Sequence, residues 1–277
     1  MEDRQFYQSI SDVLPDDQQV QTVSPDTPVA DAVEIMREEN YSQLPVVDDE
    51  RVMGIFSYRS FTEGILDLLE QNPSEDELTV GALMNQPPFR SVERDPEEVF
   101  EDLDRHDAVL VESRTNLTGI LTAMDVLHHL HSVAQPFVLI AEIERHAREV
   151  IDSCVDEDEL EECAVRALHE SPYQDEEDVP VELTEMSMGD LVGIVRHGDN
   201  WNTHFGDAFS ASGNDLQRGI VETRLDDIRE LRNTVFHLKR SLDEDEIDTL
   251  RETRTWIRER RESVQANANV QTQEDEG

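Results

Sequence analysis

The segment Gly119-Ile120-Leu121-Thr122-Ala123-Met124-Asp125 joins an apolar run to a segment with helical periodicity. Thr122 suits the start of a helix, and Asp125 would then lie in the first helical turn. A related segment, Gly54-Ile55-Phe56-Ser57-Tyr58-Arg59-Ser60, occurs earlier in the chain. The recurrence predicts that the first half of the protein is one structural unit used twice.

The predicted elements follow the same order in both copies of this unit. In the first copy we expect a strand at 20–23, a helix at 29–39, strands at 44–47 and 52–56, and a helix at 61–69. In the second copy we expect a strand at 89–92, a helix at 97–105, strands at 108–111 and 117–121, and a helix at 124–131. A β-α-β-β-α unit used twice predicts a pseudo-symmetric pair around shared sheets.

The second half of the chain has a different pattern, which predicts a helical bundle. Apolar residues recur at steps of three and four from about Pro136 onward, as in 137–151. Further helices are expected at 159–169, 191–196, 201–209, 214–239 and 243–262. The predicted fold is therefore α+β followed by all-α. Its expected parts are a paired-repeat domain at 1–135, a helical domain at 136–263 and a disordered polar tail at 264–277.

The composition indicates the expected environment of the protein. Its net charge is −42, and Lys239 is the only lysine among 23 basic residues. This composition resembles that of cytoplasmic proteins from extreme halophiles, because the Debye length falls to about 3 Å at 1 M salt. No apolar run approaches the roughly 20 residues of a membrane span, so we expect a soluble, cytoplasmic protein without membrane contact. Cys154 and Cys163 lack metal-ligand spacing and are expected to be buried thiols.

The first half, over about residues 5–133, resembles the tandem cystathionine-beta-synthase (CBS) domain pair. In that family, a Gly-x-x-Thr/Ser-x-x-Asp segment binds ribose hydroxyls through its aspartate. The threonine and the helix N-terminus bind the phosphate of the ligand. The resemblance implies a regulatory adenine nucleotide or related adenosyl ligand, bound by Gly119, Thr122, Asp125, Ser57 and Arg59. Ser60 stands at the aspartate position of the first copy, so we expect a single competent site. The alternative is that Thr122 and Asp125 only cap a helix and that the pair is a ligand-free dimerisation module.

The helical half contains the stretch Arg232-Asn233-Thr234-Val235-Phe236-His237. An arginine can hold a phosphate through two parallel hydrogen bonds, and a histidine can transfer a proton near neutral pH. This stretch resembles the Arg-x4–6-His motif of the higher eukaryote and prokaryote nucleotide-binding (HEPN) family. Those proteins are helical bundles, frequently dimeric, and many are metal-independent RNases. The resemblance implies His237 as general acid or base, Arg232 as transition-state stabiliser and Asn233 as an orienting residue.

Helical geometry suggests how these residues would come together. Five residues turn a helix about 140° beyond a full turn, so Arg232 and His237 of one straight helix point apart. We therefore expect a homodimer in which Arg232 lies near His237 of the partner subunit. Residues 218–261 contain 11 basic and 11 acidic residues, a neutral stretch suited to an RNA substrate in a chain that is otherwise acidic.

Two functions remain open at this point. The first is a metal-independent endoribonuclease controlled by an adenine-nucleotide-sensing CBS pair. The alternative is a non-catalytic adapter that binds an adenosyl ligand and dimerises through both domains, with a purely structural role for Arg232 and His237. Neither function calls for a metal, since the sequence has no cluster of His and Cys ligands.

Overall fold

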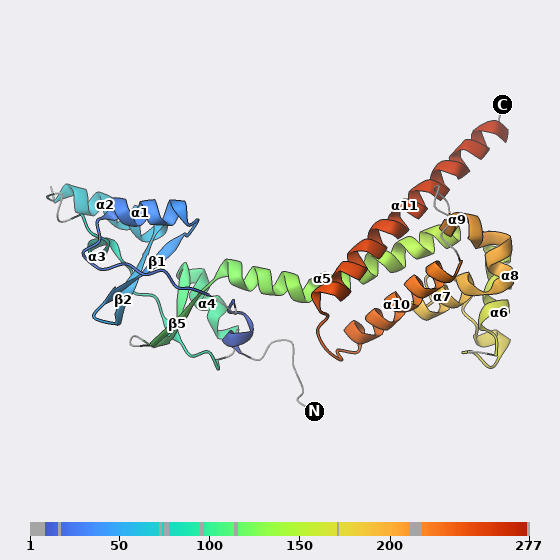
Figure 1. Cartoon of the computed structure of the whole chain (residues 1–277), viewed down its shortest axis with the longest axis horizontal. Coiled ribbons are helices and arrows are strands. Elements are labelled where there is room, and N and C mark those ends of the chain that lie inside the picture. Colours follow the sequence, from blue (N-terminus) through green and yellow to red (C-terminus); the bar gives the residue numbers. More distant parts are fainter. Residues whose placement is uncertain are drawn as a thin grey trace. The chain divides into compact units, whose positions relative to one another are not determined.

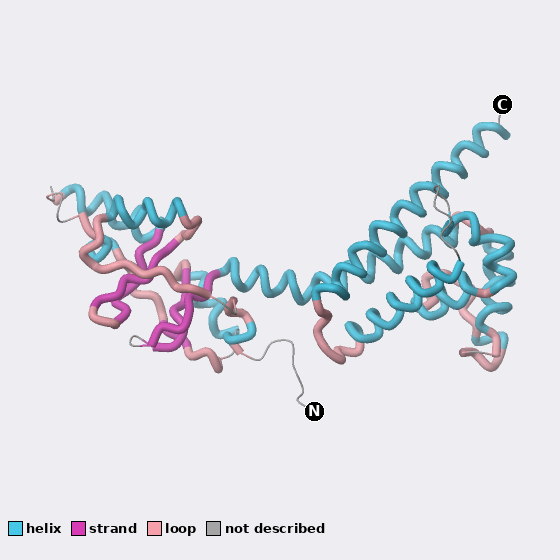
Figure 2. The backbone as a smooth tube through the Cα atoms, viewed as in Figure 1, coloured by secondary structure: helices cyan, strands magenta, loops and turns pink. Residues whose placement is uncertain are grey.

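The computed structural model describes residues 9–15, 18–71, 74, 78–94, 97–113, 116–170, 172–210 and 218–275. The chain forms two compact units, Met1–Ser132 and Val133–Gly277. The first unit contains all the strands of the described chain, and the second is built from helices (Figures 1 and 2). Residues 95–96, directly before the helix expected at 97–105, and the first four residues of the helix expected at 214–239 lie outside the described residues.

Each repeat of the first unit contains an antiparallel strand pair with the same register. β1 (Gln43–Asp48) pairs with β2 (Arg51–Ser57), and β4 (Ala108–Ser113) pairs with β5 (Asn116–Thr122). Gly54 lies opposite Val46, and Gly119 lies opposite Val111. The register shifts immediately after each valine, which indicates a bulge at the same place in both pairs. The predicted internal repeat is therefore confirmed.

The opening strand of each repeat is shorter than predicted. β3 (Phe89–Arg90) runs parallel to β4, and Leu110 donates its N–H to the carbonyl of Pro88. In the first repeat only Val23 forms a parallel bridge, with Val46. Pro45 occupies the register position of Leu110, and a proline has no N–H to extend the ladder. The missing N–H of Pro45 therefore explains why the predicted strand at 20–23 is reduced to a bridge.

The first unit contains three small apolar clusters, and helices contribute to two of them. The helices that precede α5 in this unit include α1 (Val29–Glu38), α2 (Tyr58–Glu70), α3 (Val80–Leu83) and α4 (Glu97–Arg105). One cluster packs α1 against the first strand pair, and another joins both strand pairs through Val52, Ile55 and Leu110. The third belongs to the second repeat but includes Ile10 and Val13, at the short 3-10 helix Ile10–Asp12. The N-terminal segment therefore completes the core of the second repeat, which the sequence analysis did not predict.

α5 (Ala123–Asp152) is one helix where the sequence predicted two, at 124–131 and 137–151. The predicted break at Pro136 is wrong, because Pro136 lies inside the helix. A proline removes one main-chain hydrogen bond and strains the preceding turn. The buried residues Leu139, Ile140 and Ile143 follow within two turns, and their packing favours the continued helix.

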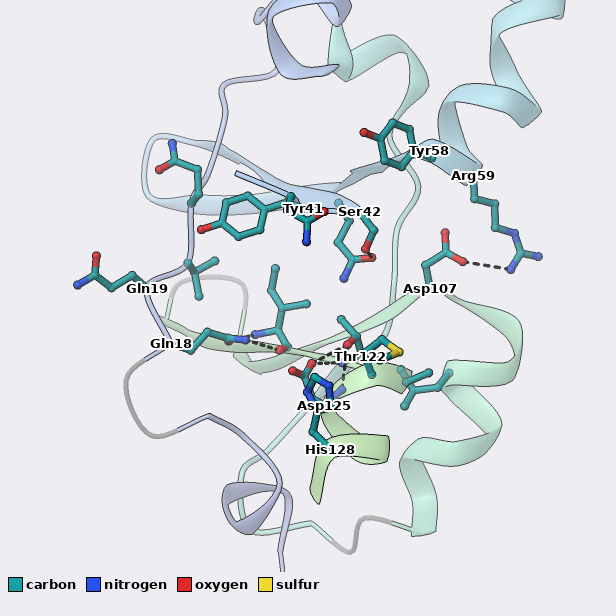
Figure 3. Close-up of a pocket in the computed structure, with 18 residues that line it drawn as sticks. Gln18, Gln19, Tyr41, Ser42, Tyr58, Arg59, Asp107, Thr122, Asp125 and His128 are labelled. Atoms are coloured by element: carbon teal, nitrogen blue, oxygen red, sulfur yellow. Dashed lines mark hydrogen bonds and ion pairs between the residues drawn. The ribbon is translucent and has the colours of Figure 1, made fainter. Parts of the chain in front are cut away.

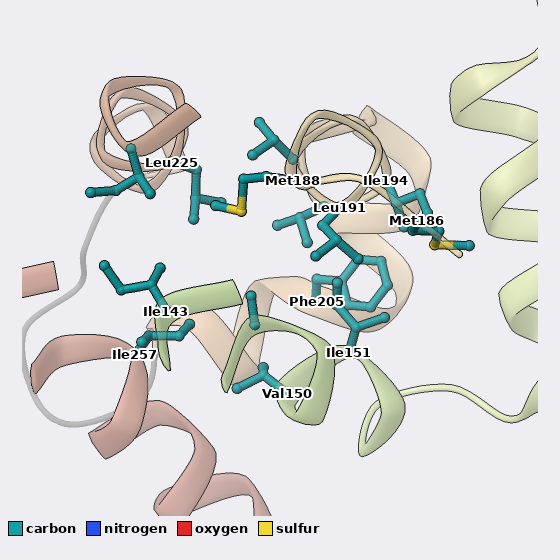
Figure 4. Close-up of a cluster of buried hydrophobic side chains, with 14 of the residues drawn as sticks. Ile143, Val150, Ile151, Met186, Met188, Leu191, Ile194, Phe205, Leu225 and Ile257 are labelled. Atoms are coloured by element: carbon teal, nitrogen blue, oxygen red, sulfur yellow. The ribbon is translucent and has the colours of Figure 1, made fainter. Parts of the chain in front are cut away.

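The second unit is organised around one large apolar cluster. Its helices are α6 (Glu157–Leu168), α7 (Met188–Arg196), α8 (Gly198–Asn200), α9 (Gly206–Ser210), α10 (Arg218–Phe236) and α11 (Glu244–Asp275), with a π-helical turn at Trp201–Phe205. Figure 4 shows Ile143 and Val150 of α5 together with Leu191 of α7, Phe205 and Ile257 of α11. The second half is thus largely helical, consistent with the prediction. α11 extends through most of the predicted tail at 264–277, and α10 ends at Phe236 rather than near Lys239. None of the helices in the described part of the chain combines the length and apolar character needed to cross a bilayer.

Candidate functional site

The first unit contains a large pocket to which both repeats contribute. Its volume is about 810 Å³, within the range of small-molecule sites. It is lined by residues 18–21 and 40–43, Tyr58, Arg59, Leu103, Asp107, Ile120, Thr122, Ala123, Met124, Asp125 and His128. Figure 3 shows Thr122 and Asp125 on one side of this pocket and Tyr58 and Arg59 on another. The starts of α2 and α5 thus line the same pocket.

At the start of α5, Thr122 and Asp125 form a reciprocal cap. Asp125 Oδ2 accepts hydrogen bonds from the Thr122 N–H at 2.8 Å and from Thr122 Oγ1 at 2.7 Å. The Asp125 N–H donates to Thr122 Oγ1 at 3.3 Å. A carboxylate has about four lone-pair sites, and both capping bonds fall on Oδ2. Helix capping and recognition of a diol are therefore compatible roles for Asp125.

At the start of α2, Arg59 supplies the positive charge of the pocket. Its Nε lies 2.9 Å from Glu63 Oε1, and its Nη1 lies 3.6 Å from Asp107 Oδ1. The hydrogen bond that Arg59 donates to Glu63 raises the pKa of Arg59, with further contributions from the charges of Glu63 and Asp107. The Arg59 side chain is 47% exposed, so these ion pairs are weak and a ligand phosphate can replace them.

The first repeat caps its helix start with two serines, whereas the second repeat uses a threonine and an aspartate. Ser60 is buried, and its Oγ accepts the Ser57 N–H at 2.8 Å, while the Ser60 N–H donates to Ser57 Oγ at 3.1 Å. Ser57 Oγ in turn donates to Asp107 Oδ2 at 3.1 Å. Asp107 of the second repeat therefore accepts from Ser57 as Asp125 accepts from Thr122. Asp107 was not predicted from the sequence, because it precedes β4 without any motif around it.

Gly119 is not among the residues that line the large pocket. A Cβ atom at this position would lie 2.8 Å from Gln18 Oε1 and 3.1 Å from Leu14 Cδ2. Gln18 holds both main-chain groups of Ile120: its Oε1 accepts the N–H at 2.7 Å and its Nε2 donates to the carbonyl at 2.9 Å. Gly119 thus makes room for Gln18, which itself lines the pocket. Its predicted contact with a ligand stays a prediction.

A smaller pocket of about 340 Å³ lies beside the first repeat's helix start. It is lined by Ile55, Ser57, Arg59, Glu63, Asn85, Gln86, Pro87, Arg105, His106, Asp107 and Ala108. Ser57, predicted as a ligand-binding residue, belongs to this smaller pocket. Arg59 and Asp107 line both pockets.

The second candidate site is at the end of α10. Arg232 Nε lies 3.5 Å from Glu144 Oε1, Arg232 Nη1 donates to Asn233 Oδ1 at 3.4 Å, and the guanidinium carbon lies 4.7 Å from the centre of the Phe236 ring. His237 follows the last residue of α10, is exposed, and donates its main-chain N–H to the Asn233 carbonyl at 3.3 Å. Within the described residues, His237 is hydrogen-bonded through its main chain. A single chain thus joins Arg232 and Asn233 through a side-chain hydrogen bond that does not include the His237 ring.

Within the described residues, no group of three or more His, Cys, Asp or Glu side chains is placed to hold a metal ion. Burial raises the pKa of the Cys154 thiol to about 11. This thiol is therefore protonated at neutral pH.

Comparison with known proteins identifies part of the chain. The family model described as "CBS domain" matches residues 10–67, so the first repeat is a CBS domain. A curated relative, inosine-5'-monophosphate dehydrogenase from Thermoplasma acidophilum, is 31% identical over 111 residues, covering 39% of this chain. The chain spans only 21% of the length of that enzyme.

Several solved structures are also similar to the chain. A structure described as CBSX2 in complex with AMP is 26% identical, covers 44% of this chain and 95% of its own, and has a TM-score of 0.38. A conserved CBS domain protein of unknown function from Thermoplasma acidophilum is 26% identical, with coverages of 44% and 68% and a TM-score of 0.37. A putative signal-transduction protein with CBS domains from Burkholderia ambifaria is 20% identical, with coverages of 44% and 93% and a TM-score of 0.39.

Proposed function

We propose that the first unit binds an adenine nucleotide, with AMP as the simplest ligand, in the large pocket and that the bound nucleotide regulates the protein. The observation that carries this proposal is that one pocket combines Thr122 and Asp125 at the start of α5 with Arg59 at the start of α2. CBS domains bind adenosine ligands such as AMP, and the first repeat is such a domain.

Each part of the nucleotide has a matching group in this pocket. The Asp125 carboxylate accepts the two ribose hydroxyls, since a carboxylate binds a diol through two parallel hydrogen bonds. The phosphate lies near Thr122, the first N–H groups of α5 and the Arg59 guanidinium. Val20 and Ile120 provide apolar surface for the adenine ring.

A ligand series tests these assignments on the unmodified protein. Isothermal titration in molar KCl with AMP, adenosine and 2′-deoxy-AMP separates the phosphate from the diol. We expect AMP to bind most tightly and each of the other two to bind about tenfold more weakly, because each lacks at least one charge-assisted hydrogen bond. Equal affinity for AMP and 2′-deoxy-AMP would contradict the role of Asp125. Absence of binding by all three would remove the proposed function.

We retain metal-independent cleavage of RNA as a second candidate function, for the second unit. One observation favours it: Arg232 Nε and Glu144 Oε1 lie 3.5 Å apart without a hydrogen bond, and the Arg232 side chain is 29% exposed. Such a guanidinium can exchange the Glu144 carboxylate for an RNA phosphate as its ion-pair partner. His237, exposed beyond the end of α10, would act as general base or acid, with Asn233 in an orienting role. This candidate requires a homodimer that places His237 of the partner subunit near Arg232, and the bound nucleotide would control the arrangement of that dimer.

Cleavage assays separate this enzyme from the non-catalytic adapter. Wild-type protein, Arg232→Ala and His237→Ala are compared on a structured RNA in molar KCl with EDTA. The ribonuclease predicts cleavage by the wild type and at least a hundredfold loss in both variants, as is typical for removal of a catalytic acid–base or charge-stabilising group. Equal rates in all three proteins would favour the adapter. Lys239→Ala, which changes a nearby charge outside the motif, is the matched control.

A further inference from the structure

The large and the small pocket share one arginine. Arg59 lines both cavities, whereas Glu63 lines only the small one. Both residues lie on α2, one helical turn apart, so their side chains meet on one face of the helix. Asp107, which precedes β4 in the other repeat, also lines both cavities. The Arg59 guanidinium therefore borders the large pocket while it is paired with the carboxylates of Glu63 and Asp107.

Two carboxylates hold Arg59 on the side of the small pocket. The Arg59 Nε donates to Glu63 Oε1 at 2.9 Å, and Asn85 Nδ2 donates to Glu63 Oε2 at 3.4 Å. The hydrogen bond from Arg59 lowers the pKa of Glu63, so this carboxylate is ionised at neutral pH. On the other side of the guanidinium, Asp107 Oδ1 lies 3.6 Å from Nη1, and Asp107 is itself fixed by Ser57 Oγ. Both competing carboxylates are thus held in place by further hydrogen bonds.

We propose that Glu63, assisted by Asp107, competes with the ligand phosphate for Arg59 and thereby sets how strongly the large pocket prefers phosphorylated over unphosphorylated adenosine ligands. Glu63 is a positioning residue in this scheme, because it acts through Arg59 and lies outside the large pocket. The proposal rests on nucleotide binding in the large pocket. It adds that a phosphate drawn to Arg59 leaves the carboxylates of Glu63 and Asp107 without their cation, so that the small pocket then disfavours a second anion.

The substitution Glu63→Gln removes the competing charge and keeps the shape of the side chain. The amide oxygen still accepts from Asn85, so the local structure is preserved. Exposed ion pairs of this kind are weak, and their loss is expected to tighten AMP binding by about two- to fivefold. Adenosine binding is expected to stay unchanged. The readout is the ratio of the dissociation constants for adenosine and AMP, measured by isothermal titration in molar KCl.

Glu98→Gln is the matched control. Glu98 forms an exposed ion pair with Arg94, also four residues apart, and lines neither pocket. This variant removes the same charge from the same unit, so it corrects for the general effect of net charge on anion binding. The expected adenosine-to-AMP ratio for Glu98→Gln is that of the wild type.

Each outcome decides the proposal. A ratio that rises in Glu63→Gln but not in Glu98→Gln supports competition for Arg59. An unchanged ratio, or equal tightening of AMP and adenosine, overturns it. If neither AMP nor adenosine binds the wild type, nucleotide binding is refuted, and inorganic pyrophosphate becomes the probe. Tighter pyrophosphate binding by Glu63→Gln then retains the competition, whereas equal binding or none overturns it as well.

Discussion

The starts of α2 and α5 occupy equivalent positions in the two repeats but are completed differently. At α5, Asp125 caps its own helix and offers a carboxylate to the large pocket. At α2, Ser60 caps through a hydroxyl, and the nearby carboxylate is Asp107 from the other repeat. The strand registers of the two repeats match, so the difference lies in side chains and not in the backbone. A repeated fold therefore need not carry the same side chains at the starts of its equivalent helices.

The largest expected effect concerns the glycines that the two repeats share. A Cβ on Gly54 would lie 2.5 Å from the main-chain oxygen of Asn85, whereas on Gly119 it would meet the Gln18 side chain at 2.8 Å. Main chain yields less readily than a side chain, so Gly54→Ala should lower the free energy of unfolding by about 3 kcal/mol and Gly119→Ala by about 1 kcal/mol. Thermal unfolding in molar KCl measures both. A larger loss for Gly119→Ala would contradict this ranking.

The next effect separates ligand binding from helix capping. Asp125→Asn keeps an oxygen to cap α5 but removes the charge that binds the diol. We expect about tenfold or weaker AMP binding with little change in stability. The corresponding change in the first repeat, Ser60→Ala, leaves the buried Ser57 N–H without its acceptor and should cost about 1 kcal/mol of stability without altering AMP affinity. Isothermal titration with AMP and thermal unfolding of both variants test whether Asp125→Asn affects affinity alone and Ser60→Ala affects stability alone. Weakened AMP binding by Ser60→Ala would count against a single site.

A smaller effect is expected for Arg59. Arg59→Gln removes a partly exposed cation at the edge of the large pocket, so AMP binding should weaken about fivefold while adenosine binding stays constant. Arg94→Gln is the matched control, because Arg94 forms a similar exposed pair outside the pockets. Equal weakening of AMP and adenosine binding would show that Arg59 shapes the pocket and does not bind phosphate.

The smallest effect is expected for Asp107. Asp107→Ala removes the hydrogen bond from Ser57 and one ion pair of Arg59, both at a partly exposed position. The loss in the free energy of unfolding should stay below about 1 kcal/mol. A loss above about 2 kcal/mol, measured by urea unfolding, would mean that the carboxylate of Asp107 holds the two repeats together.

Much of the fold could be predicted because it follows from local patterns. The helix at 97–105 and the strand pairs around Gly54 and Gly119 were predicted at or near their observed bounds, since periodicity and turn residues are local signals. The failures have non-local causes. Pro136 signals a helix break locally, but packing of the following residues continues α5. Pro45 shortened the ladder to Val23 through its missing N–H, an effect that appears only when the two strands are paired.

The sequence by itself determined the repeat, the helical second half and the pairing of Thr122 with Asp125 at a helix start. Thr122 and Asp125 are three residues apart at the helix start, so their side chains lie close together regardless of the surrounding tertiary structure. Only the tertiary structure decided that Asp107 faces Ser57 and Arg59, that Ile10 completes the second repeat's core, and that Gln18 holds Ile120. The Arg59–Asp107 and Ser57–Asp107 pairs are 48 and 50 positions apart, and the Gln18–Ile120 pair is 102 positions apart. No local rule of spacing reaches so far, because such pairs are set by how the repeats pack against each other.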